Sequence, residues 1–202
     1  MRALVLLVLL STAAHAEGGW LTARGRLEPE LALAVWGGSR TIGAGLVRPD
    51  SRGAAAGLSA ELAYAFLDRT AELRGARVWQ FSANRFGTGS ATLGASVHVV
   101  PEGVFDLGLG PHAGLNLSLG GEVFTVDLGL QTGVEIFFAQ LAPRLPQRGL
   151  ISLHLRLGDW GLGLHARIGA DIIPGHSFVG RGELAVSLGW FGFERARDGA
   201  AR

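Results

Sequence analysis

The chain has 202 residues, no cysteine and a formal net charge of +1, because 18 basic residues face 17 acidic ones. The lack of cysteine excludes a disulfide framework and a cysteine metal site, and the even charge balance argues against a nucleic-acid-binding patch. Charged residues make up 17% of the chain against a usual ~25%, and the 32 glycines follow no collagen-like triplet.

Residues 1–16 have the pattern of a secretory signal peptide. An arginine precedes an apolar run, and Ala14-His15-Ala16 gives a small-x-small cleavage pattern. The apolar run is shorter than the ~20 residues that a membrane-spanning helix needs. We therefore expect export and cleavage before Glu17, with an uncleaved anchor as the alternative.

Apolar and polar residues alternate with a period of two along the rest of the chain, which is typical of β-strands. In residues 161–173, Leu164 and Ile168 fall on one face, whereas His165 and Arg167 fall on the other. The same alternation predicts further strands, in chain order, near residues 31–35, 42–46, 58–66, 71–85, 91–99, 105–119, 124–138, 151–157 and 184–190.

Two residues interrupt the alternation inside predicted strands. Arg77 breaks the apolar face of residues 71–85. This predicts either a bulge or, if the strand crosses a membrane, a strand end that extends beyond the membrane. Pro111 lacks a backbone donor, so it predicts a bulge, a strand end or a split into two strands.

The breaks between strands predict short and long connections. Residues 140–148, QLAPRLPQR, are expected to form the longest break. They and a break at 173–177 contrast with short turns at Gly120-Gly121 and 158–161. Short and long connections alternate in this way along the chain of a membrane barrel, because short turns lie at one end of the barrel and longer loops at the other.

The orientation of the two faces decides the class of protein. In a soluble sheet the glycines of the polar face, such as Gly108, Gly114 and Gly163, would be exposed and would weaken the strands. In a small membrane barrel they would make room for larger side chains in a narrow interior. Aromatic residues near predicted strand ends also fit the two interfacial girdles of a membrane barrel: Phe105, Phe124, Phe138, Trp160, Phe178 and Trp190.

We therefore predict an all-β fold, a single closed antiparallel up-and-down transmembrane β-barrel of about ten strands, with eight or twelve as alternatives. The barrel domain would cover residues 17–193, and a polar tail would cover residues 194–202. A secreted soluble β-barrel or sandwich that binds a ligand is the alternative.

On this pattern the chain resembles the small bacterial outer-membrane β-barrels over nearly all of residues 20–193. GELAVSLGWFGF, residues 182–193, is similar to that family's closing strand, although here nine residues follow Phe193, whereas family members commonly end on the aromatic. The resemblance implies an outer-membrane location in contact with lipid and lipopolysaccharide, and recognition by the barrel-assembly machinery. It implies a structural or minor small-solute channel role, with no cofactor and no nucleic acid, and leaves the oligomeric state open.

The polar face collects histidines and charges of both signs. We interpret them as a paired network that fills a polar lumen, because buried charges need partners; a narrow conduit or ligand pocket is the alternative. The expected lumen residues are Glu61, Glu72, Arg74, Asp106, His112, Asp127, Glu135, His154, Arg156, His165, Arg167, Asp171, Arg181 and Glu183, with Glu30 and His98 on the same face.

An enzyme that modifies lipid A or phospholipids is the remaining alternative. Its only catalytic candidates are Ser152 and His154, roughly 7 Å apart on one strand face, and Glu135 or Asp171 would orient the histidine. The order Ser-x-His differs from the His-x-Ser of lipid A deacylase barrels, and no Gly-x-Ser-x-Gly elbow is present. The histidines show no ligand spacing, so we expect no metal.

Overall fold

The computed structural model describes residues 31–50, 55–66, 69–83, 87–101, 106–121, 123–139, 142–174 and 179–191. The expected signal peptide, the tail at 194–202, and Glu30, Phe105, Phe178 and Phe193 lie outside these residues, as does the side chain of Arg181. The strands are β1 Ala32–Gly38, β2 Thr41–Pro49, β3 Ala56–Ala65, β4 Thr70–Ala83, β5 Gly87–Val100, β6 Asp106–Gly120, β7 Phe124–Gly133, β8 Glu135–Phe137, β9 Ala142–Leu157, β10 Trp160–Ile172 and β11 Val179–Phe191.

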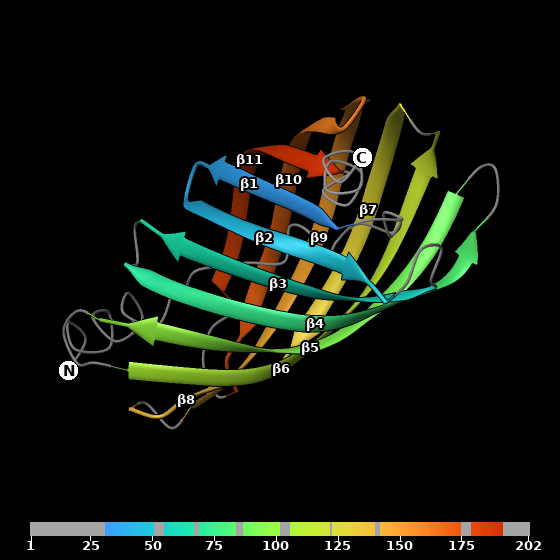
Figure 1. The fold of residues 1–202 in the computed structure, drawn as a ribbon. Helices are drawn as coiled ribbons and strands as arrows, with labels where there is room; N and C mark the ends of the chain where they lie inside the picture. The colour runs from blue at the N-terminus through green and yellow to red at the C-terminus, as the bar shows by residue number, and fades with distance from the viewer. Residues whose placement is uncertain are drawn as a thin grey trace, which may run out of the picture.

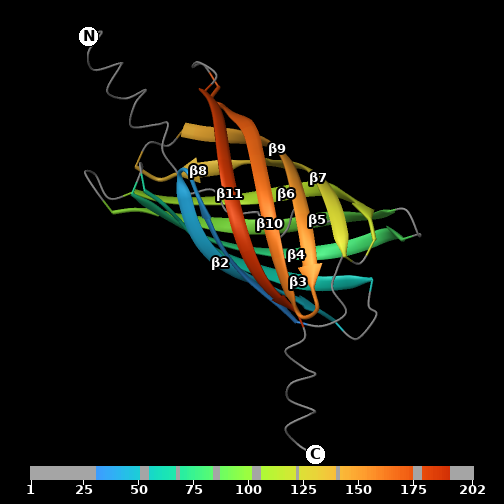
Figure 2. The ribbon, with the colours of Figure 1, turned by 90° about the horizontal axis from the view of Figure 1, so that it is seen from above.

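The strands form one closed antiparallel sheet. Consecutive strands pair along the chain, and β1 pairs with β11, which closes the barrel. Since β7 and β8 both lie between β6 and β9, the 11 strands occupy ten positions. β1 to β6 cross the front of the barrel in Figure 1, and β9 to β11 form the opposite wall (Figure 2). The predicted all-β, up-and-down barrel of ten strands is confirmed.

The outer face of the barrel is apolar. Large aliphatic side chains stand out from the middle of the wall, with Leu62 57%, Leu115 60%, Leu130 68%, Ile168 70% and Val186 60% exposed. The side chains between them point the other way and are buried, and they carry most of the charge of the strands. This is the reverse of a soluble sheet, in which the apolar face is the one removed from water. Among the described residues there is no helix long and apolar enough to cross a membrane.

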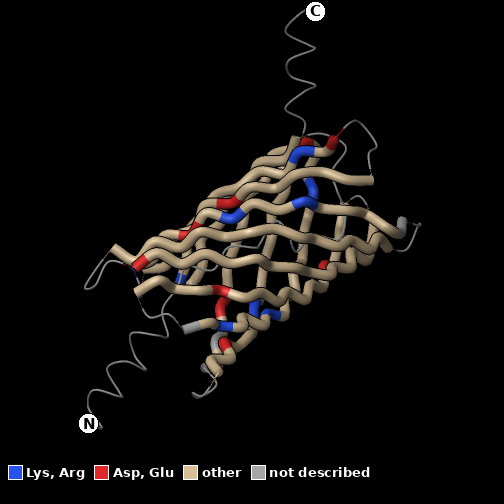
Figure 3. Tube along the Cα trace, turned by 90° about the horizontal axis from the view of Figure 1, so that it is seen from below, with Lys and Arg blue, Asp and Glu red and all other residues tan. Residues whose placement is uncertain are grey.

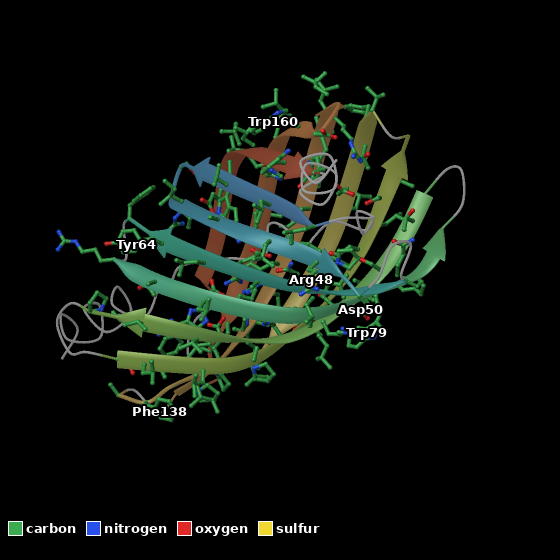
Figure 4. The ribbon with its side chains drawn as sticks, in the orientation of Figure 1. Arg48, Asp50, Tyr64, Trp79, Phe138 and Trp160 are labelled. Atoms are coloured by element: carbon green, nitrogen blue, oxygen red, sulfur yellow. The ribbon has the colours of Figure 1, made fainter. Side chains whose placement is uncertain are left out.

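Exposed aromatic side chains lie near the strand ends, in two groups. Tyr64 and Phe138 belong to one end of the barrel, where β3 and β8 finish. Trp79 and Trp160 belong to the other half of the barrel, and Figure 4 shows Trp160 at the top and Trp79 near the point where β2 ends. Trp160 also stacks on Trp190 of β11, with 6.0 Å between the ring centroids. Two aromatic groups separated by an aliphatic belt match the girdle arrangement of membrane barrels.

The expected break at residues 140–148 is wrong, because β9 begins at Ala142 and continues to Leu157. Proline normally interrupts a sheet, since it has no N–H to donate. Pro146 is tolerated because it lies opposite a gap in the neighbouring strand: β9 pairs with β7 as far as Gln147 and with β8 from Arg144. The missing donor therefore falls where no ladder bond is required.

Pro111 lies inside the continuous strand β6, and the interruption occurs in the adjacent strand. β6 pairs with β7 as far as His112 and with β8 from Leu109, so Pro111 faces Val134, which separates β7 from β8. The Val134 N–H donates to the Pro111 carbonyl at 3.0 Å. Of the outcomes predicted for Pro111, the split into two strands occurs, but in the partner strand.

The bulge expected at Arg77 is also displaced. Arg77 pairs in regular register with Leu58 of β3 and Leu93 of β5. The register between β4 and β5 shifts instead between Gln80 and Ser82. Arg77 breaks the hydrophobic pattern because it makes an outward ion pair with Asp50, not because the backbone is irregular.

The expected contrast between short turns and long loops holds only in part. The turns at 121–123 and 158–159 share one end, and the connections at 138–141 and 173–178 lie at the other. The connection at 50–55 departs from the contrast because it shares the end of the short turns, and the two-residue turn 39–40 departs from it at the opposite end. Gly158 has φ of 63° at the first position of its two-residue turn, a conformation that favours glycine there.

Inward glycines make room for aromatic rings, and Gly43 of β2 provides a test. A Cβ on Gly43 would lie 2.3 Å from Cζ2 of the buried Trp36 and 2.6 Å from the Leu62 carbonyl oxygen. We expect Gly43→Ala to lower the free energy of unfolding by about 1–3 kcal/mol through overpacking. Urea titration of the folded protein in detergent measures this loss.

Gly75→Ala is the matched control, because a Cβ there meets only the Ser59 carbonyl oxygen at 3.9 Å. Its stability should be unchanged or slightly raised, since alanine loses less backbone entropy than glycine on folding. Equal losses for the two variants would contradict the close contact at Gly43.

Candidate functional site: the polar interior of the barrel

A cluster of charges lies inside the barrel between β4, β5 and β8. Arg74 donates from Nε to Glu72 Oε1 at 3.0 Å, and its Nη2 lies 2.9 Å from the same oxygen. His98 Nε2 lies 3.4 Å from Glu135 Oε1, 3.9 Å from Glu72 Oε1 and 3.0 Å from the Ser96 hydroxyl. Glu72 and His98 are no more than 1% exposed. We call Glu72, Arg74, His98 and Glu135 the glutamate–arginine cluster. The predicted lumen residue Glu61 is also buried, at 2% exposed, and lies on β3, the strand next to β4.

Some contacts of this cluster bridge strands that are not neighbours. Arg74 Nη1 on β4 donates to Gln131 Oε1 on β7 at 3.2 Å, although β5 and β6 separate these strands in the wall. His98 of β5 and Glu135 of β8 likewise stand on either side of β6. Side chains that meet in this way occupy the space inside the wall. Acidic and basic positions lie beside one another on the strands in Figure 3.

A second group connects β6, β7, β9, β10 and β11. The Ser118 hydroxyl donates to Asp127, and Asp127 Oδ2 lies 3.0 Å from His154 Nε2. The rings of His154 and His165 are 5.1 Å apart at their centroids, in a T-shaped contact. We call this group, which also includes Ser152 and Ser187, the histidine–serine row.

The catalytic candidates Ser152 and His154 do not form a nucleophile–base pair. Ser152 Oγ lies 2.8 Å from Nδ1 of His165, its cross-strand partner on β10. The other ring nitrogen, Nε2, lies 2.7 Å from Ser187 Oγ, so each nitrogen of His165 lies beside a serine hydroxyl, unlike the histidine of a triad, which lies between a serine and a carboxylate. Ser152 is 2% exposed on the inner face, away from any lipid around the barrel.

The carboxylate beside His154 is also different from those expected. Asp127 takes this place, whereas Glu135 contacts His98 and Asp171 pairs with Arg148. The register explains this: on β7, the neighbour of β9, Thr125 is opposite His154 and Asp127 is opposite Ser152. The geometry supports hydrogen-bonded packing rather than acyl transfer.

Two further ion pairs tie the closing strands together. Arg167 Nη2 lies 2.5 Å from Glu183 Oε2, and the other Glu183 oxygen accepts from the Thr41 hydroxyl at 2.6 Å and from its backbone N–H at 2.9 Å. Arg148 Nη2 lies 2.5 Å from Asp171 Oδ1. Glu183 thereby joins β11 to β2 across β1 and stabilises the closure of the barrel.

Among the remaining predicted residues, Asp106 and Arg156 contact backbone groups, whereas His112 lies within electrostatic range of Glu72, Arg74 and His98 of the glutamate–arginine cluster. Asp106 Oδ1 accepts from the Ala139 N–H at 2.8 Å, and Arg156 donates to the Gly158 carbonyl at 3.0 Å. His112 is 7% exposed, and neither ring nitrogen has a hydrogen-bond partner among the described residues. The side chain of Arg181 is outside the described part of the chain.

Sequence reasoning missed the aromatic and apolar part of the interior. Trp36, Phe137 and Phe191 are at most 5% exposed, and Arg144 lies 4.4 Å above the Phe137 ring. Each of these three aromatics falls, in the alternation of its strand, on the same face as the polar residues. That position could have identified it as an interior residue. Arg144 was hidden in the segment expected to be a loop. An apolar layer consists of Ala34, Trp36, Val47, Ala63, Ala65, Leu150 and Ala185.

No group of three or more histidine and acidic side chains in the described residues has the geometry to hold a metal ion. The described interior contains ion pairs, and hydroxyls and imidazoles in hydrogen-bonding contact.

No protein-family model and no curated protein matches the chain. Among solved structures, it is similar to one described as "KdgM porin in complex with disordered oligogalacturonate". The similarity covers 79% of this chain and 97% of that chain, at 10% sequence identity and a TM-score of 0.40.

Proposed function

We propose that the protein is an integral outer-membrane β-barrel with a structural or minor small-solute role and a lumen largely filled by side chains. Lipid and lipopolysaccharide surround its wall, and the barrel-assembly machinery inserts it. The orientation of the wall carries this proposal, because aliphatic side chains cover the outside while ion pairs lie inside.

The outer surface supports the membrane part of the proposal. Soluble monomers rarely expose large contiguous apolar patches, whereas here residues such as Leu130, Leu164 and Ile168 are 53–70% exposed in the middle of their strands. In a bilayer this surface is matched to the acyl chains. A closed barrel also satisfies its backbone hydrogen bonds without an edge, as the hydrocarbon region requires.

The contacts inside support the filled lumen. Arg74 reaches Gln131 on a distant strand, and Glu183 reaches Thr41 across β1. A ten-stranded barrel is close to the size whose interior side chains can fill. Solute passage is therefore restricted to small species.

Cell fractionation of the exporting bacterium tests the membrane proposal. We expect the protein in the outer-membrane fraction, extracted only by detergent, with different gel migration before and after boiling. Recovery from the soluble periplasm would support the secreted binding protein instead and would overturn the proposal.

Planar-bilayer recordings test the state of the lumen. We expect the purified protein to show a conductance far below that of a water-filled porin of 16 strands or more, since side chains cross its interior. A large, stable open-channel current would contradict the filled lumen and leave the membrane location intact.

A further inference from the structure

Charged side chains on the outside of the strands are confined to one place. Among strand residues whose side chains the structure describes, only Arg48 of β2 and Arg77 of β4 carry charge on the outward face. Asp50 follows directly after β2. A charged side chain that faces hydrocarbon destabilises a membrane barrel. Two outward arginines on strands separated only by β3 therefore require an explanation.

The register places these residues together. Leu58 of β3 is opposite Arg48 on one side and Arg77 on the other, so the arginines are roughly 10 Å apart at their backbones. Arg77 Nη1 donates to Asp50 Oδ1 at 2.8 Å, and Nη2 contacts Oδ2. Arg48 makes no ion pair with another described residue. Figure 4 shows Arg48, Asp50 and Trp79 gathered where β2 ends.

The level of the patch matches the edge of a hydrocarbon layer. Trp79, 41% exposed, lies two residues beyond Arg77 on the same face and belongs to one aromatic group. Phe81, 65% exposed, follows on the same strand. Aromatic side chains concentrate at the depth of lipid headgroups, where arginine side chains also reach the interface.

The charge of the patch selects the ligand. Two guanidinium groups and one carboxylate leave a net charge of +1, and guanidinium binds phosphate oxygens in a bidentate manner. We propose that Arg48, Asp50, Arg77 and Trp79, the headgroup patch, bind the phosphate of an anionic phospholipid. The inference rests on the proposed membrane insertion.

Native mass spectrometry of the full protein in detergent, titrated with phosphatidylglycerol or phosphatidylcholine, tests the patch. We expect wild type to retain phosphatidylglycerol in preference, and the double variant Arg48→Gln/Arg77→Gln to lose affinity by roughly fivefold to tenfold for each arginine. Asp50→Asn should raise the affinity for phosphatidylglycerol severalfold. It removes a negative charge that repels the lipid phosphate, and it releases Arg77 from its ion pair with Asp50. Arg40→Gln, in the turn at the opposite end, is the matched control and should behave as wild type.

Equal retention of phosphatidylglycerol by wild type and the double variant would overturn the headgroup patch. Displacement of the lipid by millimolar inorganic phosphate would also overturn it, because the patch would then take free phosphate. These outcomes differ from failure of the proposed function, in which the wild-type protein would stay soluble without detergent.

Discussion

Replacing Arg74 with methionine is expected to lower the free energy of unfolding by about 3–5 kcal/mol. The substitution removes the guanidinium 2.9 Å from the fully buried Glu72 carboxylate and the hydrogen bond to Gln131. Breaking a buried pair in this way leaves a carboxylate that water cannot solvate. Urea unfolding of the protein refolded into phosphatidylcholine bilayers, which offer the headgroup patch no anionic lipid, measures the loss.

Arg77→Met is the matched control, because Arg77 lies three residues further on the same strand and pairs with Asp50 at the surface. Exposed ion pairs contribute about 0–1 kcal/mol, so this variant should remain near wild type. The double variant Glu72→Gln/Arg74→Met should lose less than Arg74→Met alone, since it removes both charges. Equal losses for Arg74→Met and Arg77→Met would contradict the buried pair.

Leu130→Arg is expected to lower the free energy of unfolding in bilayers by about 2–4 kcal/mol. Leu130 is 68% exposed near the middle of the strand position shared by β7 and β8. In a lipid-embedded barrel the arginine would lie near the bilayer midplane. In a soluble protein the same surface change would stay within about 0.5 kcal/mol, so the measurement separates the two classes.

Leu119→Arg is the depth control for this experiment. Leu119, 40% exposed, lies next to the last residue of β6, close to one aromatic end. The cost of an arginine falls to about 0–1 kcal/mol near the interface. A similar effect at both positions would show that burial in a bilayer does not set the penalty.

The strand pattern of the sequence predicted most of the fold. Alternation such as that of Leu164 and His165 depends only on the period of an extended chain, so it located ten strands and their two faces. It failed at residues 142–148, where β9 replaces the expected loop, because Pro146 is acceptable only opposite the gap between β7 and β8. Whether a strand accepts a proline depends on whether the neighbouring strand needs a hydrogen bond at that position. The local sequence does not specify this.

The candidate site was less accessible from the sequence. Polar residues on the inner face were identifiable by parity, but their partners were not. The sequence suggested Ser152 with His154, whereas the structure joins Ser152 to His165 and His154 to Asp127. Such contacts depend on register, and Arg74 with Gln131 depends further on the curvature that brings β4 opposite β7.

The sequence by itself determined the alternating faces, the approximate strand number and the presence of charges of both signs, because each follows from local periodicity and composition. The tertiary structure agreed with the predicted orientation of the two faces, and it alone decided which charges pair and why Arg77 stands on the apolar side. Closure of the barrel is the physical reason: it fixes the register between β1 and β11, and with it every distance across the interior.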